Sequence, residues 1–429
     1  MGSKWNFILL SVLAIFSSSV ESARILAVVP SPTHSHHIWN RSLMLALAKR
    51  GHHITVLSPD IEKEKVPNYR HILLEDSYTT NEEKFDFEEM AEGPLLSVTL
   101  VMDWGIECCK HQMQTKGAKE LLRMPPDSFD LIIMETVFND CTFLYLHHFG
   151  GGTRIPIVGI TAYGIGPWTD LLTGARTMPS VFAFPSLPFL SKMSFWERLV
   201  NTATTGVYWA GMYFYYHPLQ QKIAEAAYGK PLPPLWKLAS NISLLLVNNH
   251  YVLNGPQALL PGIIDVSGMQ CSPSKPLPKD IHDFIDGSPK GAIYFSLGSN
   301  IKSEILRKEK LKIIINTFAA LGPEIRVLWK FDPSTSIEDL PANVLLKKWL
   351  PQEDVLGHPK LLAFVSHGGL LSTQESIYHR VPIVGLPFFV DQHTNVRRLV
   401  EMGIGKQVDY KTLNKETFTT TILEVINNP

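Results

Sequence analysis

The stretch FVSHGGLLSTQESIYHRVPIVGLPFFVDQHTNVRRLVEMG, residues 364–403, decides the fold. Its pattern predicts a strand, a glycine turn, a helix, a second strand, a turn and a second helix. The first strand runs into His367-Gly368-Gly369, and a helix opens near Leu370. A histidine, two glycines that allow close approach and a helix N-terminus therefore lie together, which is an arrangement suited to a diphosphate.

The second predicted strand of this stretch, residues 382–387, brings Asp391 and Gln392 to the same edge of the sheet. In an open parallel sheet, ligands lie outside the carboxyl ends of the strands. Polar side chains gather at that edge here, so the sequence predicts a nucleotide-sugar site.

This stretch, with Trp349-Leu350-Pro351-Gln352 before it, resembles the signature of the UDP-glycosyltransferase family (glycosyltransferase family 1, GT-B fold). The form GGLLSTQE is similar to the arthropod branch of that family. The resemblance extends over nearly all of the chain after the first segment and is clearest from Gly291 onward. It implies an α/β fold in which two Rossmann-like domains face each other across a cleft.

Length and composition fit a globular chain of two or three domains, with 429 residues, 45% hydrophobic and 18% charged. The net charge of −1 argues against a nucleic-acid partner. The four cysteines are too few for a disulfide scaffold, although one bridge could form. No zinc-like spacing occurs.

Residues 1–22 read as a secretory signal peptide, with a lysine, a short apolar core and small residues at the exit. Asn40 and Asn241 begin Asn-x-Ser triplets, which suit a glycosylated chain in the lumen of the endoplasmic reticulum. The resemblance implies a C-terminal membrane anchor that this chain lacks, so we expect it to be truncated. Membrane association would then occur through the N-terminal domain or the missing anchor.

Alternating strands and helices predict a parallel sheet in each half of the chain. We expect an N-terminal acceptor-binding domain over 23–265, a proline-rich linker over 266–285 and a UDP-sugar-binding domain over 286–429. In the first domain we expect strands at 24–29, 53–57, 129–134 and 155–161, and helices at 39–50, 141–149 and 194–228. In the second we expect strands at 291–297, 326–331 and 344–349, and helices at 304–321 and 414–426. Residues 62–125 are less regular.

The helix over 194–228 has a capping box at Ser194 and Glu197, and residues 207–216 place aromatic side chains on every side. Core packing explains such a pattern. A wall of the acceptor pocket or a membrane-facing surface is the alternative.

Glycosyl transfer needs a base for the acceptor hydroxyl, and histidine titrates near the operating pH. The sequence Thr33-His34-Ser35-His36-His37 follows the first predicted strand. In the resembled family the base lies fifteen residues before the glycine that ends the first helix, which is Gly51 here, and this implies His36. A metal cluster is the alternative, but no second patch of ligands accompanies it.

A base histidine needs an acid that orients it and stabilises its imidazolium. The family places an aspartate at the end of the strand at 129–134, where this chain has Glu135. Glu135 is the favoured residue, and Asp140 is the alternative. Either acid could instead cap the helix that follows.

The resemblance assigns the donor side chains of the second domain. Trp349 would stack on uracil, Gln352 would reach a polar group of the nucleoside, and Glu375 would accept from the ribose hydroxyls. The residues expected at the diphosphate are Ser299, His367, Gly369 and Ser372, and Asp391 and Gln392 would hold the sugar hydroxyls.

The implied reaction is an inverting, metal-independent transfer, since no Asp-x-Asp occurs in the sequence. The UDP-sugar is a co-substrate, and no cofactor or metal is expected. Asp391 disfavours a glucuronate carboxylate, so UDP-glucose is the expected donor. The apolar, aromatic first half indicates a small lipophilic alcohol or phenol as acceptor. A lumenal binding protein without turnover is the alternative.

Overall fold

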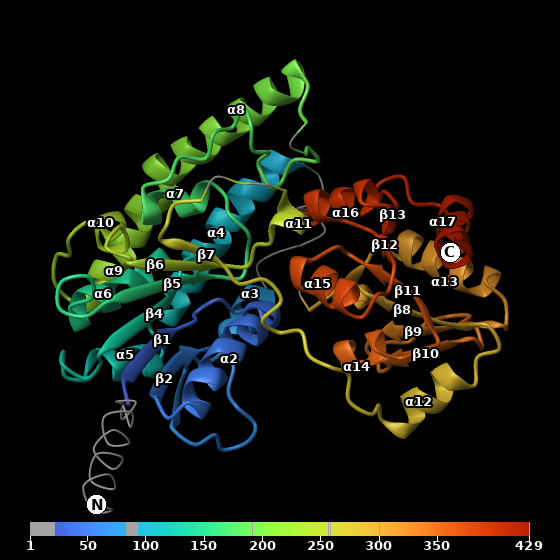
Figure 1. Cartoon of the computed structure of the whole chain (residues 1–429), viewed down its shortest axis with the longest axis horizontal. Coiled ribbons are helices and arrows are strands. Elements are labelled where there is room, and N and C mark those ends of the chain that lie inside the picture. The colour runs from blue at the N-terminus through green and yellow to red at the C-terminus, as the bar shows by residue number, and fades with distance from the viewer. Residues whose placement is uncertain are drawn as a thin grey trace, which may run out of the picture.

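The computed structural model describes residues 22–82, 93–190, 192–255, 257, 259–299 and 301–428. The chain forms two parallel β-sheets, each with helices around it (Figure 1). The seven-stranded sheet has the order β3-β2-β1-β4-β5-β6-β7, and the six-stranded sheet has the order β10-β9-β8-β11-β12-β13. The predicted fold class is therefore confirmed.

Apart from the edge strand at residues 69–73, the strands of the first sheet are short and largely apolar, which is typical of parallel strands covered on both faces. Their bounds are β1 Arg24–Val28, β2 His53–Ser58, β3 Tyr69–Leu73, β4 Leu131–Glu135, β5 Ile157–Thr161, β6 Leu244–Val247 and β7 Ile263–Asp265. β1 pairs with both β2 and β4, so the strand order reverses between β1 and β4. That reversal opens a crevice at the carboxyl ends of these two strands.

The helices of the first domain cover both faces of this sheet. Their bounds are α2 His34–Lys49, α3 Ser77–Glu82, α4 Pro94–Gln112, α5 Lys116–Leu122, α6 Leu144–Phe149, α7 Pro167–Thr173, α8 Phe195–Gly211, α9 His217–Tyr228, α10 Leu235–Ala239 and α11 Tyr251–Asn254. The predicted capping box at Ser194 and Glu197 opens α8. A π-helical turn at Met212–Tyr216 joins α8 to α9, and Gly229 ends α9 with a positive φ. The single long helix predicted over 194–228 thus forms without a break, with the π-helical turn in its middle.

The second sheet repeats the same arrangement. Its strands are β8 Gly291–Ser296, β9 Ile325–Lys330, β10 Val344–Lys347, β11 Leu361–Ser366, β12 Ile383–Gly385 and β13 Gly405–Gln407. Its helices are α12 Lys279–Asp286, α13 Lys308–Ala320, α14 Gln352–Leu356, α15 Leu370–Tyr378, α16 Gln392–Glu401 and α17 Lys415–Asn427. β8 pairs with both β9 and β11, so a second crevice opens beyond the ends of β8 and β11.

The starts of two predicted helices and the predicted linker differ from the structure. α2 begins at His34 instead of residue 39, because the helix already starts after the extended Thr33 and takes the histidines into its first turn. α13 begins at Lys308 instead of residue 304, since the backbone at Arg307 is still extended. The end of the predicted linker forms α12, whose Ile281 and Ile285 are buried against the second sheet.

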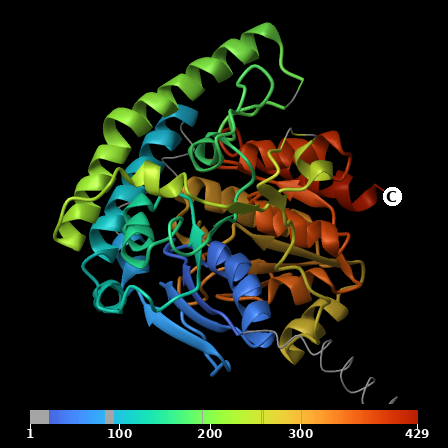
Figure 2. The same cartoon turned by 60° about the vertical axis from the view of Figure 1, so that its left-hand side comes forward.

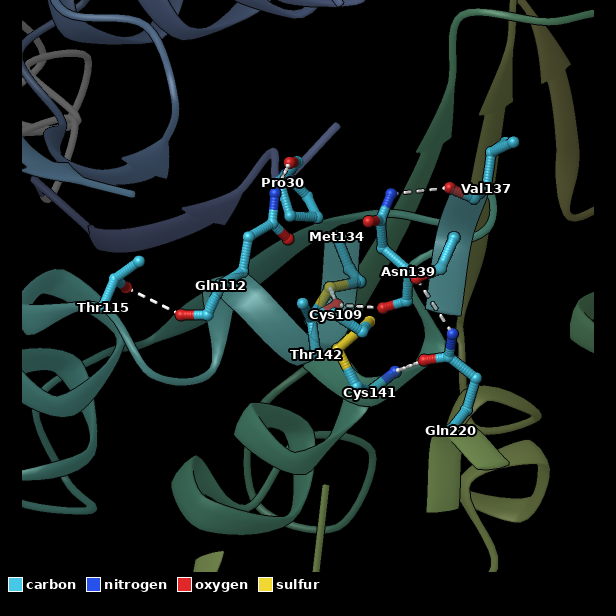
Figure 3. Close-up of a disulfide and its surroundings, with 11 residues drawn as sticks. Pro30, Cys109, Gln112, Thr115, Met134, Val137, Asn139, Cys141, Thr142 and Gln220 are labelled. Atoms are coloured by element: carbon cyan, nitrogen blue, oxygen red, sulfur yellow. Dashed lines mark hydrogen bonds between the residues drawn. A yellow bond between two sulfur atoms is a disulfide. The ribbon is translucent and has the colours of Figure 1, made fainter. Parts of the chain in front are cut away.

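A disulfide joins Cys109 of α4 to Cys141, which follows β4 (Figure 3). Close to it, Gln220 of α9 accepts a hydrogen bond from the backbone N–H of Cys141 at 2.8 Å and donates to the carbonyl of Gly105 at 3.2 Å. Gln112 of α4 donates to the carbonyl of Pro30. These contacts fix α4 and α9 to the loops that follow β1 and β4.

The two domains also contact each other directly. The Gln374 amide of α15 donates to Asn248 Oδ1 at 2.7 Å and to Ser267 Oγ at 2.8 Å. Thr394 of α16 donates to the carbonyls of Pro185 and Leu187 at 3.0 Å. Figure 2 shows α2 and the second domain side by side across this boundary.

The predicted signal peptide lies outside the described residues, apart from its last residue, Ser22. Within the described ranges, none of the helices combines the length and the apolar character that a membrane span requires.

Candidate functional site

The two crevices face each other and enclose the candidate site. One cavity of about 600 Å³ is lined by Thr33 and His36 from the first domain and by Gly298 and Lys330 from the second. An adjoining cavity of about 350 Å³ reaches further along the second domain, to His367 and Asp391. The two cavities share lining residues, so side chains from the ends of both sheets lie around one continuous space.

His36 and Glu135 form a buried pair in this region. Nδ1 of His36 lies 2.7 Å from Oε1 of Glu135, the last residue of β4. The Glu135 carboxylate also accepts from the Ser31 N–H and the Asn40 amide, both at 3.3 Å. A carboxylate at Nδ1 leaves Nε2 of His36 as the basic nitrogen of the neutral ring. The ring edge packs against Tyr163, with the centroids 4.8 Å apart.

Asp140 points elsewhere. Its Oδ2 lies 3.1 Å from Nδ1 of His217 in α9, and within the described part of the chain no ion pair joins it to His36. The structure therefore brings Glu135, and not Asp140, to the histidine that the resemblance singles out.

Asn40 is one of the two candidate glycosylation sites, and it is buried in α2 with its amide bound to Glu135. A glycan cannot reach that nitrogen in the folded chain, so Asn40 is withdrawn as a glycosylation site. Asn241 is exposed. Sequence reasoning gave Asn40 no place in the site, although it lies one helical turn after His36.

The three histidines at 34–37 diverge. His34 Nδ1 contacts Asp60, His36 contacts Glu135, and Ser58 Oγ lies 3.2 Å from Nδ1 of His37. Each ring thus has its own hydrogen-bond partner, and Oδ2 of Asp60 also lies 3.9 Å from Nδ1 of His37. Among the described residues no group of three or more His, Cys, Asp or Glu side chains comes close enough to hold a metal ion.

The turns after β8 and β11 touch each other. Gly298 has a φ of +86°, and a Cβ there would lie 2.6 Å from Cε1 of His367. A Cβ at Gly369 would lie 2.5 Å from Nε2 of the same ring. Both glycines are therefore required by close approach to His367. Burial lowers the pKa of His367 to about 3, so the ring is neutral and donates from one nitrogen only. Its Nδ1 is buried without a hydrogen-bond partner in the described structure.

Lys330 is a site residue that the sequence analysis missed. It is the last residue of β9, its Nζ donates to the carbonyl of Gly298 at 2.7 Å, and it lies 4.8 Å from the centre of the Trp349 ring. Burial lowers its pKa to about 8. Its place at the carboxyl end of a strand was the available signal.

Trp349, Gln352 and Glu375 lie together at one end of the cleft. The Trp349 side chain is exposed to the cavity, and the residue is 60% accessible. The Gln352 amide donates to Glu375 Oε2 at 2.6 Å and to Ser372 Oγ at 2.9 Å, while Tyr294 donates to Gln352 Oε1 at 3.2 Å. Burial raises the pKa of Glu375 to about 7.

Asp391 and Gln392 begin α16 at the other end. Burial raises the pKa of Asp391. The hydrogen bond that its Oδ2 accepts from Asn395 at 2.8 Å and the nearby His36 both oppose that rise. Gln392 Oε1 accepts from the backbone N–H groups of Phe388 and Phe389 at 2.8 and 3.2 Å. Ser299 lines both cavities between the two ends. The site thus runs from an aromatic face, past a neutral histidine and a lysine, to a buried carboxylate opposite His36.

Comparison with known proteins agrees with this geometry. Residues 24–429 match the protein family described as "UDP-glucoronosyl and UDP-glucosyl transferase". The chain belongs to this family. It is therefore a glycosyltransferase that takes its sugar from a UDP-sugar, and the predicted family is confirmed.

Relatives of this UDP-glycosyltransferase include insect and mammalian proteins. The "UDP-glycosyltransferase UGT5" of Dactylopius coccus is 34% identical over 97% of this chain and 79% of its own length. The "UDP-glucuronosyltransferase 2B33" of Macaca mulatta is 29% identical over 100% of this chain and 82% of its own length. Among solved structures, the calicheamicin glycosyltransferase CalG4 has a TM-score of 0.60 at 18% identity, covering 95% of this chain and 91% of that one. That likeness supports the two-domain fold.

Proposed function

We propose that this UDP-glycosyltransferase moves glucose from UDP-glucose to a hydroxyl group of a small lipophilic alcohol or phenol, with His36 as the general base. The observation that carries the proposal is the buried His36–Glu135 pair beside the cleft. His36 of this pair also lies near enough to Asp391 to influence the pKa of that carboxyl.

The proposed reaction is a single displacement. Nε2 of His36 takes the proton of the acceptor hydroxyl, and the acceptor oxygen attacks the anomeric carbon. The bond from that carbon to the diphosphate oxygen breaks with its electron pair, and UDP leaves from the opposite face, which inverts the configuration. The Glu135 carboxylate stabilises the imidazolium that forms.

The leaving diphosphate would be held without a metal ion. Lys330 would supply a positive charge, neutral His367 a hydrogen-bond donor, and the first turn of α15, after Gly369, the backbone N–H groups of a helix N-terminus. The absence of Asp-x-Asp from the sequence agrees with this route.

The sugar and acceptor proposals follow from the lining of the cleft. Asp391 lies where the sugar would bind, and a carboxylate there favours the neutral hydroxyls of glucose over the carboxylate of glucuronate. Next to His36, the larger cavity is bounded by the apolar side chains of Val101, Trp104, Val137 and Phe138. These side chains suit a lipophilic acceptor.

We also propose a lumenal location with membrane contact through α8. This helix buries Asn201, Thr204 and Thr205, whose polar side chains face the domain, and exposes apolar residues instead. The exposed large apolar and aromatic residues of α8 and the turn after it are Phe195, Trp196, Leu199, Val200, Val207, Tyr213, Phe214 and Tyr215. From Arg198 to Ala224 the sequence contains no acidic residue. Such a face suits the interfacial region of a bilayer, and α8 lies along the outer edge of the domain in Figures 1 and 2.

The experiment compares UDP release by the purified chain from UDP-glucose and from UDP-glucuronate, with one simple phenol as acceptor. The proposal predicts faster release from UDP-glucose and a product whose anomeric configuration is inverted by NMR. Preference for UDP-glucuronate, or retention of configuration, would contradict it. In a separate assay, the chain should float with phosphatidylcholine vesicles, and Trp196→Asp with Phe214→Asp should abolish flotation.

A further inference from the structure

The first turn of α2 carries a second histidine–carboxylate pair that the proposed reaction does not use. Nδ1 of His34 lies 2.8 Å from Oδ1 of Asp60. Tyr78 of α3 donates from its hydroxyl to Oδ2 of Asp60 at 2.6 Å, and its ring stacks on the His34 ring with centroids 4.3 Å apart. Three separate segments, α2, the loop after β2 and α3, thus fix one imidazole ring.

That ring is open to the cleft. The His34 side chain is 43% exposed and lines both cavities of the site. Since Asp60 occupies Nδ1, the nitrogen left to face the cleft is Nε2, which makes no hydrogen bond to the described residues. A ring held firmly on one side with a free nitrogen on the other is built to contact a ligand.

The position of His34 along the cleft differs from that of His36. The His34 ring meets the edge of Trp349 with centroids 6.3 Å apart, and it shares its cavities with Ser299 and Lys330. His36 instead lies near Asp391 and is one of the groups that lower the pKa of that carboxyl. Following the proposed binding of the donor, His36 lies opposite the sugar and His34 lies opposite the nucleotide.

The chemistry of that position points to an anion. Among the described first-domain residues that line the two cavities, His34 and His36 are the side chains able to carry a positive charge. We propose that Nε2 of His34 donates a hydrogen bond to the diphosphate of the bound donor, with Asp60 and Tyr78 as its positioning residues. Because Nδ1 faces the Asp60 carboxylate, donation from Nε2 requires the doubly protonated ring, whose positive charge would then lie between that carboxylate and the diphosphate.

This inference rests on the proposed donor site, and it adds a contact from the acceptor-binding domain. The two domains would then hold the leaving group from opposite sides, Lys330 and His367 from one and His34 from the other. Donor binding would then place His36, the proposed base, next to the anomeric carbon of the sugar.

The test measures the affinities of UDP and of uridine by calorimetry for the full chain and its variants. His34→Ala should weaken UDP binding about tenfold and leave uridine binding within about twofold, because uridine lacks the diphosphate. His282→Ala, which removes an exposed histidine beside Asp283 on α12, is the matched control and should change neither affinity.

Asp60→Asn keeps the shape of the side chain and tests the positioning role. It should weaken UDP binding in the parent chain but add nothing in the His34→Ala background, whereas a merely structural role would give additive losses. Equal losses for UDP and uridine, additive losses, or unchanged UDP affinity in His34→Ala would overturn the inference. Failure of the parent chain to bind UDP would instead refute the donor site itself.

Discussion

Glu135→Gln is the substitution that most sharply tests how the base is oriented. The carboxylate is buried and accepts from His36 Nδ1 at 2.7 Å and from Ser31 and Asn40 at 3.3 Å. Glutamine keeps the volume and one acceptor oxygen, but it removes the negative charge. Its NH₂ group can also donate to Nδ1, which would move the proton to Nε2, where the ring can no longer act as a base.

The expected loss follows from the hydrogen bond that is removed. A charge-assisted hydrogen bond to a buried group contributes up to about 3 kcal/mol, and the imidazolium also loses its counter-charge, so the barrier should rise by about 3–4 kcal/mol. kcat should therefore fall about 10²–10³-fold, whereas the KM for the UDP-sugar should stay within about twofold.

The assay is UDP release with UDP-glucose and a phenol, with folding checked by circular dichroism. Asp140→Asn is the matched control, because Asp140 is also a buried acid beside a histidine but pairs with His217. It should retain kcat within about threefold. Equal losses in the two variants, or near-normal turnover in Glu135→Gln, would refute the assignment of Glu135.

Three further predictions concern the donor site and the stability of the chain. Burial raises the pKa of Glu375 to about 7, and its ionised form is proposed to accept from the ribose hydroxyls, so uridine binding should tighten about tenfold from pH 6 to pH 8. Calorimetry with Glu375→Gln should show a flat profile, and a pH-dependence that persists there would exclude this carboxyl. Gly298→Ala should displace His367 and weaken UDP binding; Gly322→Ala, with a φ of +76° and open space around its Cβ, should cost about 1 kcal/mol of stability and leave UDP binding intact. Replacing both Cys109 and Cys141 by serine removes the disulfide that closes a loop with a sequence separation of 32. In urea titrations this should lower the free energy of unfolding by about 3–4 kcal/mol, with Cys271→Ser as the control. A loss under about 1 kcal/mol would contradict this expectation.

The fold was predictable because its signals are local. The stretch at 364–403 alternates apolar strands with glycine turns, and β11, α15, β12 and α16 form there as expected. The capping box at Ser194 likewise gave the start of α8 correctly. Boundaries were less predictable where the end of a helix depends on tertiary contacts, as at His34, whose ring is held by Asp60 and Tyr78 from distant segments.

The position of a residue in the candidate cleft was predictable where the residue follows a strand end within a recognisable motif. His367, Trp349 and Asp391 are of this kind. Lys330, Asn40 and the Gln374 contact between the domains were missed, because each acts through a partner far away in the sequence: Gly298, Glu135 and Asn248. The choice between Glu135 and Asp140 likewise needed the direction in which each side chain points.

The central claim is that His36 removes the acceptor proton during transfer from a bound UDP-sugar. The most direct measurement compares turnover and UDP affinity in the parent chain and in His36→Ala. The account predicts that turnover with UDP-glucose and a phenol falls by at least about 10²-fold, while the Kd for UDP stays within about twofold. Turnover that survives the substitution, or that falls only in proportion to a loss of UDP binding, would contradict it.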